Sequence, residues 1–121
     1  MNEHRLIVWL GDSKEKLSSF PLQVKQEVGF SLRRIQKGST PDNTSPLPRW
    51  SAMEIKANHD GEAYRGVYIT KLSNEIYVLH RFHKKSTDGK KSPNRDIATL
   101  NARFAEAKRL SKEGRASHAK G

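Results

Sequence analysis

The sequence contains no cysteine among its 121 residues. This absence excludes disulfide bonds, thiolate metal sites and a cysteine nucleophile, and it is compatible with a reducing cytosol. No apolar run approaches the length needed to cross a membrane, and the N-terminus lacks the pattern of a signal peptide. We therefore expect a cytoplasmic protein that does not enter a membrane.

Recognisable catalytic motifs are also missing. There is no glycine-rich phosphate loop and no Gly-x-Ser-x-Gly elbow, and the acidic residues are scattered. Of the five histidines, His80 and His83 are three apart, which on a strand places them on opposite faces. Without cysteine or a convergent pair of carboxylates, this pattern predicts no metal site and no cofactor.

Acidic residues are outnumbered by basic ones, and the imbalance is uneven. The chain has 23 Lys and Arg against 13 Asp and Glu, a formal net charge of +10. Residues 80–121 hold twelve basic and four acidic side chains, whereas residues 1–79 hold eleven and nine. This skew favours a polyanionic partner, either nucleic acid or an acidic protein. The alternative is a solvated basic tail that aids solubility.

The first third of the chain predicts a strand followed by a helical hairpin. Residues 6–10 form a continuous apolar run, as in a buried strand. Asp12 or Ser13 can cap a helix, and Pro21 fits the first turn of a second helix. That second helix has one apolar stripe, formed by Val24, Val28, Leu32 and Ile35, and Gly38 stands at its end. Gly29 beside the stripe suggests close approach to a neighbour, or is simply tolerated there.

The rest of the chain predicts a sheet and a last helix. Residues 38–49 contain three prolines among polar residues and are expected to form a loop. Three strands follow, near 50–57, 63–72 and 75–83, and their short turns imply an antiparallel meander. Ser92-Pro93 opens the final helix, with a buried stripe of Ile97, Leu100, Phe104 and Ala107.

These elements amount to an α+β fold with one domain. From Ser111 onward almost nothing is apolar, so the chain there is expected to be frayed. We predict one domain over residues 1–110 and a flexible basic C-terminal tail over residues 111–121.

A cluster of cations surrounds the end of the third predicted strand. With a two-residue turn at 73–74, the numbers of paired residues sum to roughly 147. Arg65 then falls nearly opposite Phe82, close to the point where His83 and Lys84 emerge. The candidate phosphate-binding residues around this point are Arg81, Lys90, Lys91 and Arg95.

Such a surface suits RNA cleavage, because RNA supplies its own nucleophile, the 2′-hydroxyl. The reaction needs a group to accept the 2′ proton, cations to stabilise the phosphorane, and a proton for the leaving oxygen. His83 is the candidate acid/base residue, and Arg65 with Lys84 or Lys85 would stabilise the phosphate. Alternatively, these residues only bind RNA or pair with an acidic inhibitor.

The order of elements and several short segments together resemble the HigB-type toxins of the RelE superfamily. The resemblance covers roughly residues 5–108, and its landmarks are Phe20-Pro21, Leu32 to Gly38, Pro46-Leu47, Met53 to Ile55, Asp60 to Tyr68, Val78 to Ser86, and Pro93. Position 83 is commonly glutamine in this branch, whereas here it is histidine. Arg65 matches the arginine of the family's Tyr-Arg motif, and Lys84-Lys85 match its basic pair.

The resemblance implies a RelE-like fold and the toxin of a type II toxin–antitoxin pair. Such a toxin is a metal-independent endoribonuclease that cuts mRNA in the ribosomal A site. The implied partner is a HigA-type helix-turn-helix antitoxin, through which the pair would bind operator DNA. Two alternatives remain open: a non-catalytic inhibitor of DNA gyrase, as ParE-type relatives are, and a regulatory module that binds nucleic acid.

Overall fold

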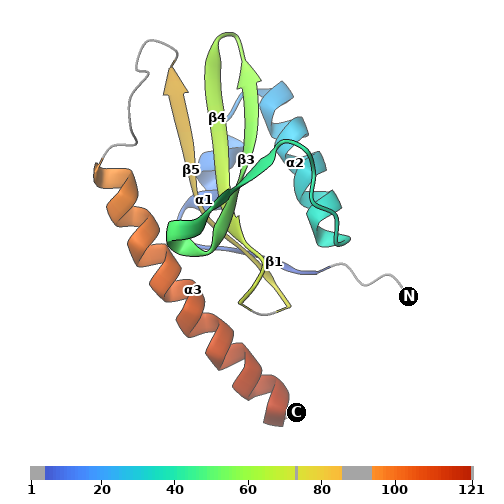
Figure 1. Cartoon of the computed structure of the whole chain (residues 1–121), viewed down its shortest axis with the longest axis vertical. Coiled ribbons are helices and arrows are strands. Elements are labelled where there is room, and N and C mark those ends of the chain that lie inside the picture. The colour runs from blue at the N-terminus through green and yellow to red at the C-terminus, as the bar shows by residue number, and fades with distance from the viewer. Residues whose placement is uncertain (1–4, 73, 86–93, 121) are drawn as a thin grey trace.

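The structure, a computed structural model, describes residues 5–72, 74–85 and 94–120. The order of its elements confirms the predicted α+β class, with a strand, two helices, a meander and a C-terminal helix (Figure 1). In chain order they are β1 (Ile7–Trp9), α1 (Ser13–Ser18), α2 (Leu22–Gln36), β2 (Thr44–Leu47), a 3-10 turn (Pro48–Trp50), β3 (Ala52–His59), β4 (Glu62–Ile69), β5 (Ile76–Lys85) and α3 (Asn94–Lys120).

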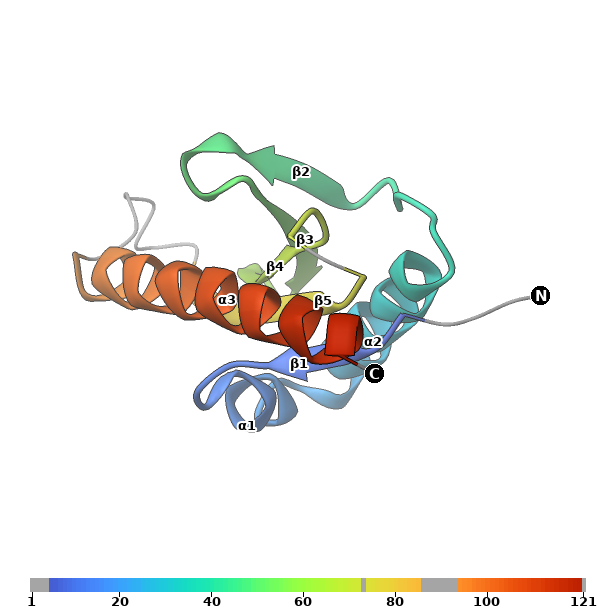
Figure 2. The same ribbon diagram turned by 90° about the horizontal axis from the view of Figure 1, so that it is seen from below.

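The five strands form one mixed sheet in the order β1-β5-β4-β3-β2 (Figure 2). β1 runs parallel to β5, and the other neighbours are antiparallel. The predicted pairing of Arg65 with Phe82 is confirmed. The predicted two-residue turn is not, because β4 ends at Ile69 and β5 begins at Ile76, and Ile69 pairs with Tyr77, one residue out of the predicted register. The turn between β3 and β4 places Asp60 and Gly61 at positive φ, as a two-residue hairpin requires.

β2 corrects the expectation that residues 38–49 form only a loop. Thr44–Leu47 pairs with β3, and Pro46 lies opposite Met53. The proline is tolerated because β2 is at the edge of the sheet, where an N–H on the outer side needs no strand partner. The proline-rich segment therefore contains an edge strand as well as irregular chain.

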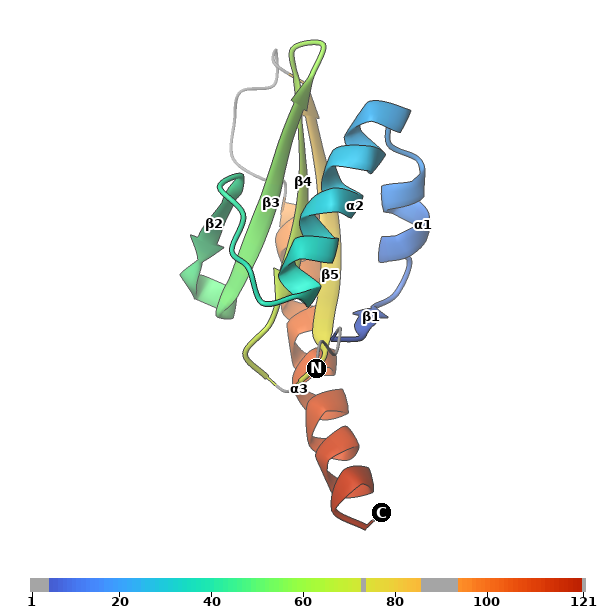
Figure 3. The same ribbon diagram turned by 90° about the vertical axis from the view of Figure 1, so that its right-hand side faces the viewer.

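Each face of the sheet is covered by helix. The predicted stripe of α2 is buried with Ile55 and Tyr64 on one face, which α1 and α2 cover (Figure 3). On the opposite face, Leu100 and Ala107 of α3 pack with Val67 and Ile69. We call these the hairpin face and the α3 face. The structure describes no helix that is long and apolar enough to cross a membrane.

β5 contains one residue more than the strand beside it. His80 pairs with Val67, and Val78 pairs with Tyr68, so Leu79 has no counterpart on β4. An extra residue of this kind is a β-bulge, and it changes which face the following residues take. Val78 lies on the hairpin face, whereas both Leu79 and His80 lie on the α3 face, where His80 meets the first turn of α3.

Arg103 of α3 holds this bulge. Its Nη1 donates to the carbonyl oxygens of Leu79 at 2.7 Å and Leu10 at 3.2 Å. Its Nη2 donates to Asp12 Oδ1 at 3.0 Å, and this hydrogen bond is the main reason why the pKa of Asp12 lies below its usual range. One side chain thus connects α3 with the bulge, the end of β1 and the start of α1.

α3 is longer than the sequence predicted. It runs from Asn94 to Lys120 and so extends past Ser111, where the sequence predicted the start of the tail. Ser111 itself is buried, and Arg109 pairs with Glu113 one turn further along at 2.8 Å. Such pairs on one helix face support helix where little is apolar. The division into a domain and a basic tail stays a prediction.

Gly29 approaches no neighbour among the described residues, so the first of its two expected roles is not observed within the chain. It lies within α2, and a Cβ built there meets nothing within 4 Å. Gly11 is the opposite case, because its φ is +54° and a Cβ would overlap the guanidinium of Arg103. The fold therefore requires glycine at position 11 and not at position 29.

We predict that Gly29→Ala raises the free energy of unfolding by about 0.5–1 kcal/mol, because glycine inside a helix loses more conformational freedom than alanine. Gly11→Ala is the matched control and should lower it. Urea unfolding followed by tryptophan fluorescence measures both. A loss of stability in Gly29→Ala would show that α2 needs glycine for a contact within the chain.

Candidate functional site

Arg65 lies in the middle of the sheet, on the α3 face. It is two residues from Val67, which packs under α3, and alternate residues of a strand share a face. Its side chain is 39% exposed, so part of the guanidinium is open to solvent. Lys56 on β3 pairs with it directly in the register and is exposed. Like charges directly opposite each other are unfavourable, and a bound anion between them would offset the repulsion.

A buried carboxylate forms an ion pair with Arg65. Glu54 Oε1 lies 3.4 Å from Arg65 Nη1, and the side chain of Glu54 is only 7% exposed. Arg65 Nε is buried and has no hydrogen-bond partner among the described residues. Glu54 therefore fixes one side of the guanidinium and leaves other N–H groups available to a ligand. The two-residue turn at Asp60-Gly61 determines the register between β3 and β4. Glu54 could therefore have been predicted as a neighbour of Arg65.

The register places Lys84 on the same face as Arg65. Lys84 pairs with Ala63, and Phe82 pairs with Arg65 itself. Paired residues of adjacent strands share a face, so positions 82 and 84 belong to the α3 face. The structure describes the backbone alone at residues 82–85. Arg65, Lys56 and position 84 thus form one cationic group on neighbouring strands.

The other predicted residues of β5 occupy the opposite face. Arg81 pairs with Gly66, His83 with Tyr64 and Lys85 with Glu62. Tyr64 belongs to the core under α1 and α2, so these positions lie on the hairpin face. The strand alternation therefore separates His83 and Lys85 from Arg65, although all of them lie near one end of the sheet. Arg81 Nε is buried without a hydrogen-bond partner.

The remaining predicted cations follow β5 in the sequence. Lys90 and Lys91 lie outside the described residues. Arg95 lies in the first turn of α3, where the structure describes its backbone alone. Their assignment to phosphate binding stays a prediction, as does the catalytic assignment of Arg65, His83, Lys84 and Lys85.

His80 has a structural role that sequence reasoning did not assign. Its Nε2 lies 2.9 Å from Asp96 Oδ1, and the His80 side chain is 11% exposed. The contact joins β5 to the first turn of α3. Over the described ranges 5–72, 74–85 and 94–120, no group of three His, Asp or Glu side chains is placed to hold a metal ion.

The tyrosines near the site are poor proton acceptors. Burial, and then the nearby Glu62 carboxylate, raise the pKa of Tyr64 above its usual value. The ring of Tyr64 packs edge-on against Phe20, with centroids 4.8 Å apart. Burial raises the pKa of Tyr68 in the same direction. Both phenols therefore stay protonated at neutral pH.

Comparison with known proteins assigns the family. Residues 15–105, three quarters of the chain, match the model of the phage-derived protein Gp49-like family (DUF891). The chain belongs to this family. It is the HigB-like toxin family of the RelE/ParE superfamily, so the resemblance found in the sequence is confirmed. No curated protein and no solved structure matches the chain.

The matched range of this HigB-like chain contains the whole cationic group. It spans the end of β5, the loop after it and the first turns of α3, along with Arg65, Lys56 and Glu54. The N-terminal strand and the end of α3 lie outside the match. The site therefore lies within the part of the chain that defines the family.

We predict that Arg65→Ala lowers the free energy of unfolding by about 1–3 kcal/mol, because it leaves the buried carboxylate of Glu54 without its charged partner. Glu54→Gln in the same chain should restore part of this loss. Urea unfolding of the two single variants and the double variant measures the coupling. If the double variant were no more stable than Arg65→Ala, the ion pair would not be what holds the arginine.

Proposed function

We propose that this protein is the toxin of a type II toxin–antitoxin system and a ribosome-dependent mRNA endoribonuclease. The observation that supports this best is the cationic group of the α3 face. Arg65 is oriented by a buried carboxylate, lies opposite another cation, Lys56, and shares its face with position 84. Such an arrangement is suited to a phosphate group whose negative charge increases during reaction.

The proposed cleavage uses the ribose as its nucleophile. The 2′-oxygen forms a bond to phosphorus and loses its proton, and the bond from phosphorus to the 5′-oxygen breaks as that oxygen gains a proton. The products are a 2′,3′-cyclic phosphate and a 5′-hydroxyl, and no metal is required. Arg65 and Lys84 stabilise the extra charge on the phosphate oxygens.

His83 is proposed to transfer protons. Its imidazole titrates near neutral pH, so it can both accept and donate. Position 83 belongs to the hairpin face, next to Lys84 at the end of β5, and RNA would have to pass this edge of the sheet to reach it. Lys85 occupies the same face and is the alternative. Arg81, Lys90, Lys91 and Arg95 would bind neighbouring phosphates.

The proposed partners follow from the family. A HigA-type helix-turn-helix antitoxin would neutralise the toxin, and the complex would bind operator DNA through the antitoxin. The substrate is mRNA in the A site of the ribosome, which places the activity in the cytoplasm.

The test is to map transcript 5′ ends after brief induction. We expect new ends at preferred codons, and a drop of about a hundredfold or more for the pair Arg65→Ala with Glu54→Gln. Lys84→Ala should lower cleavage similarly. Arg109→Ala should not, because Arg109 is an exposed cation of α3 outside the proposed site. His83→Gln should shift the pH dependence of the rate if this histidine transfers protons. Intact transcripts with altered DNA supercoiling would instead identify a gyrase inhibitor.

A further inference from the structure

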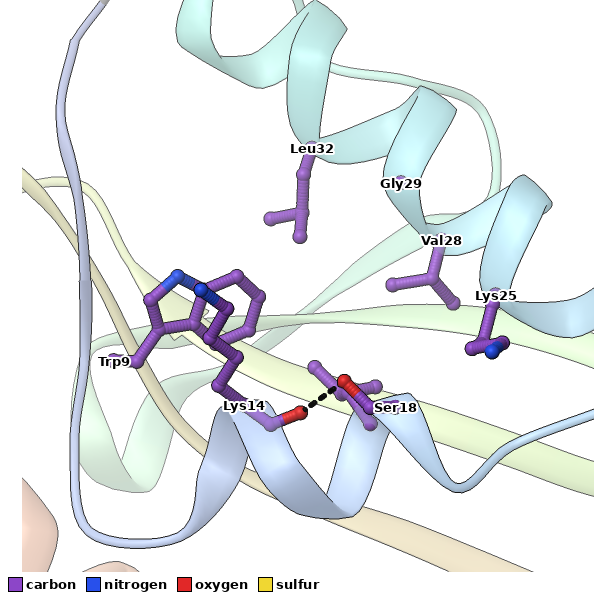
Figure 4. Close-up of a pocket in the computed structure, with 8 residues that line it drawn as sticks. Trp9, Lys14, Ser18, Lys25, Val28, Gly29 and Leu32 are labelled. Atoms are coloured by element: carbon purple, nitrogen blue, oxygen red, sulfur yellow. Dashed lines mark hydrogen bonds between the residues drawn. The ribbon is translucent and has the colours of Figure 1, made fainter.

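A groove lies between α1 and α2, on the hairpin face and thus on the side opposite Arg65 (Figure 4). Its volume is about 170 Å³, which is the size of a cavity that accepts a benzene ring. Apolar side chains form much of its lining, and lysines border it. The lining residues are Trp9, Lys14, Leu17, Ser18, Lys25, Val28, Gly29 and Leu32.

Gly29 has no explanation within the described chain. It is exposed inside α2, where glycine is unfavourable relative to alanine. Its φ is not positive, and nothing lies within 4 Å of a Cβ built there. Glycine on a helix surface allows the backbone of another segment to approach closely. Because Gly29 forms part of the wall of the groove, a segment bound in the groove would use that close approach.

The surface beside the groove is apolar and basic. Leu22 lies two helical turns from Gly29 on the same stripe of α2, and 64% of it is exposed. Lys14 and Lys25 border the groove and are exposed, and Arg33 continues the stripe beyond Gly29. The acidic residues of the two helices are Glu15, beside Lys14, and Glu27, which lies off the stripe.

We propose that this groove is the docking site of a partner protein, which inserts a bulky apolar side chain flanked by aspartate or glutamate. The apolar lining would contact the bulky apolar side chain, and the bordering lysines would pair with the aspartate or glutamate. An apolar depression with cations only at its border favours a protein segment over an RNA backbone. The inference rests on the proposed function only in naming the antitoxin as the protein that carries this segment.

The groove and Arg65 lie on opposite faces of the sheet. A partner docked between α1 and α2 therefore does not contact the cationic group itself. His83 lies on the same face as the groove, but Gly29, Lys14 and Lys25 are not among the proposed catalytic or phosphate-binding residues. Variants at these three positions should therefore lose the partner and keep the cleaving activity. This separation makes the docking site testable apart from the chemistry.

The direct test selects peptides from a random library displayed on phage. The full chain is the target, and Gly29→Trp protein in solution removes peptides that bind elsewhere. We expect the selected peptides to contain a bulky apolar residue flanked by acidic ones. Their Kd, measured by calorimetry, should rise at least tenfold with Gly29→Trp. The Kd should also rise as the salt concentration increases. Gly29→Ala should raise the Kd by a smaller factor than Gly29→Trp, because one Cβ takes up only part of the close approach that glycine allows.

A charge-reversed variant covers the case in which Gly29→Trp does not fold. Lys14→Glu with Lys25→Glu should weaken the same peptides at least tenfold, and Glu27→Gln should not. Peptides that lack acidic residues, or that bind all variants equally, would overturn the proposal. So would a single-stranded RNA oligonucleotide whose binding is weakened by Gly29→Trp and unaffected by Lys56→Ala, because the groove would then bind RNA.

A growth experiment connects the groove with neutralisation. Fragments of the source genome that relieve growth arrest by the wild-type chain supply the antitoxin. Gly29→Trp should still arrest growth and should need at least tenfold more antitoxin for relief than Gly29→Ala. Equal relief of both variants, or a library without any fragment that depends on Gly29, would overturn the docking site. If the wild type does not arrest growth, the proposed function fails, while the peptide result still decides the groove.

Discussion

The contact between Arg103 and the carbonyl of Leu79 determines how β5 presents its side chains. A bulge in an antiparallel pair leaves backbone groups without strand partners, and here the guanidinium of α3 supplies the missing donor. The same group reaches Leu10 and Asp12, so the bulge, the end of β1 and the start of α1 are fixed together. The position of every residue after Leu79 follows from this one arrangement.

The bulge also determines which side chains of β5 lie on each face of the sheet. Beyond it, even-numbered positions of β5 share the α3 face with Arg65, and odd-numbered positions share the hairpin face with Tyr64. The proposed phosphate group and the proposed docking groove are separated by the sheet itself. The buried apolar residues of the sheet thus separate a proposed phosphate-binding surface from a proposed protein-docking surface.

Much of the fold could be predicted from short-range patterns. The apolar stripe of α2 indicated its buried face, and the short turns indicated the meander. The pairing of Arg65 with Phe82 was predicted from a two-residue turn, whereas in the structure it depends on the bulge, because pairs before the bulge, such as Ile69 with Tyr77, are one residue out of the predicted register. The bulge and β2 could not be predicted, since they depend on partners distant in the chain, such as Arg103. Glu54 was overlooked, although the β3–β4 turn placed it beside Arg65.

Leu79 divides β5 into two segments with separate sequence requirements. The residues before it are enclosed on both faces, so any exchange there must conserve volume. After it, the alternation is shifted by one residue, His80 is still buried, and Arg81 is only half-buried. The requirement for conserved volume therefore weakens within two residues of the bulge.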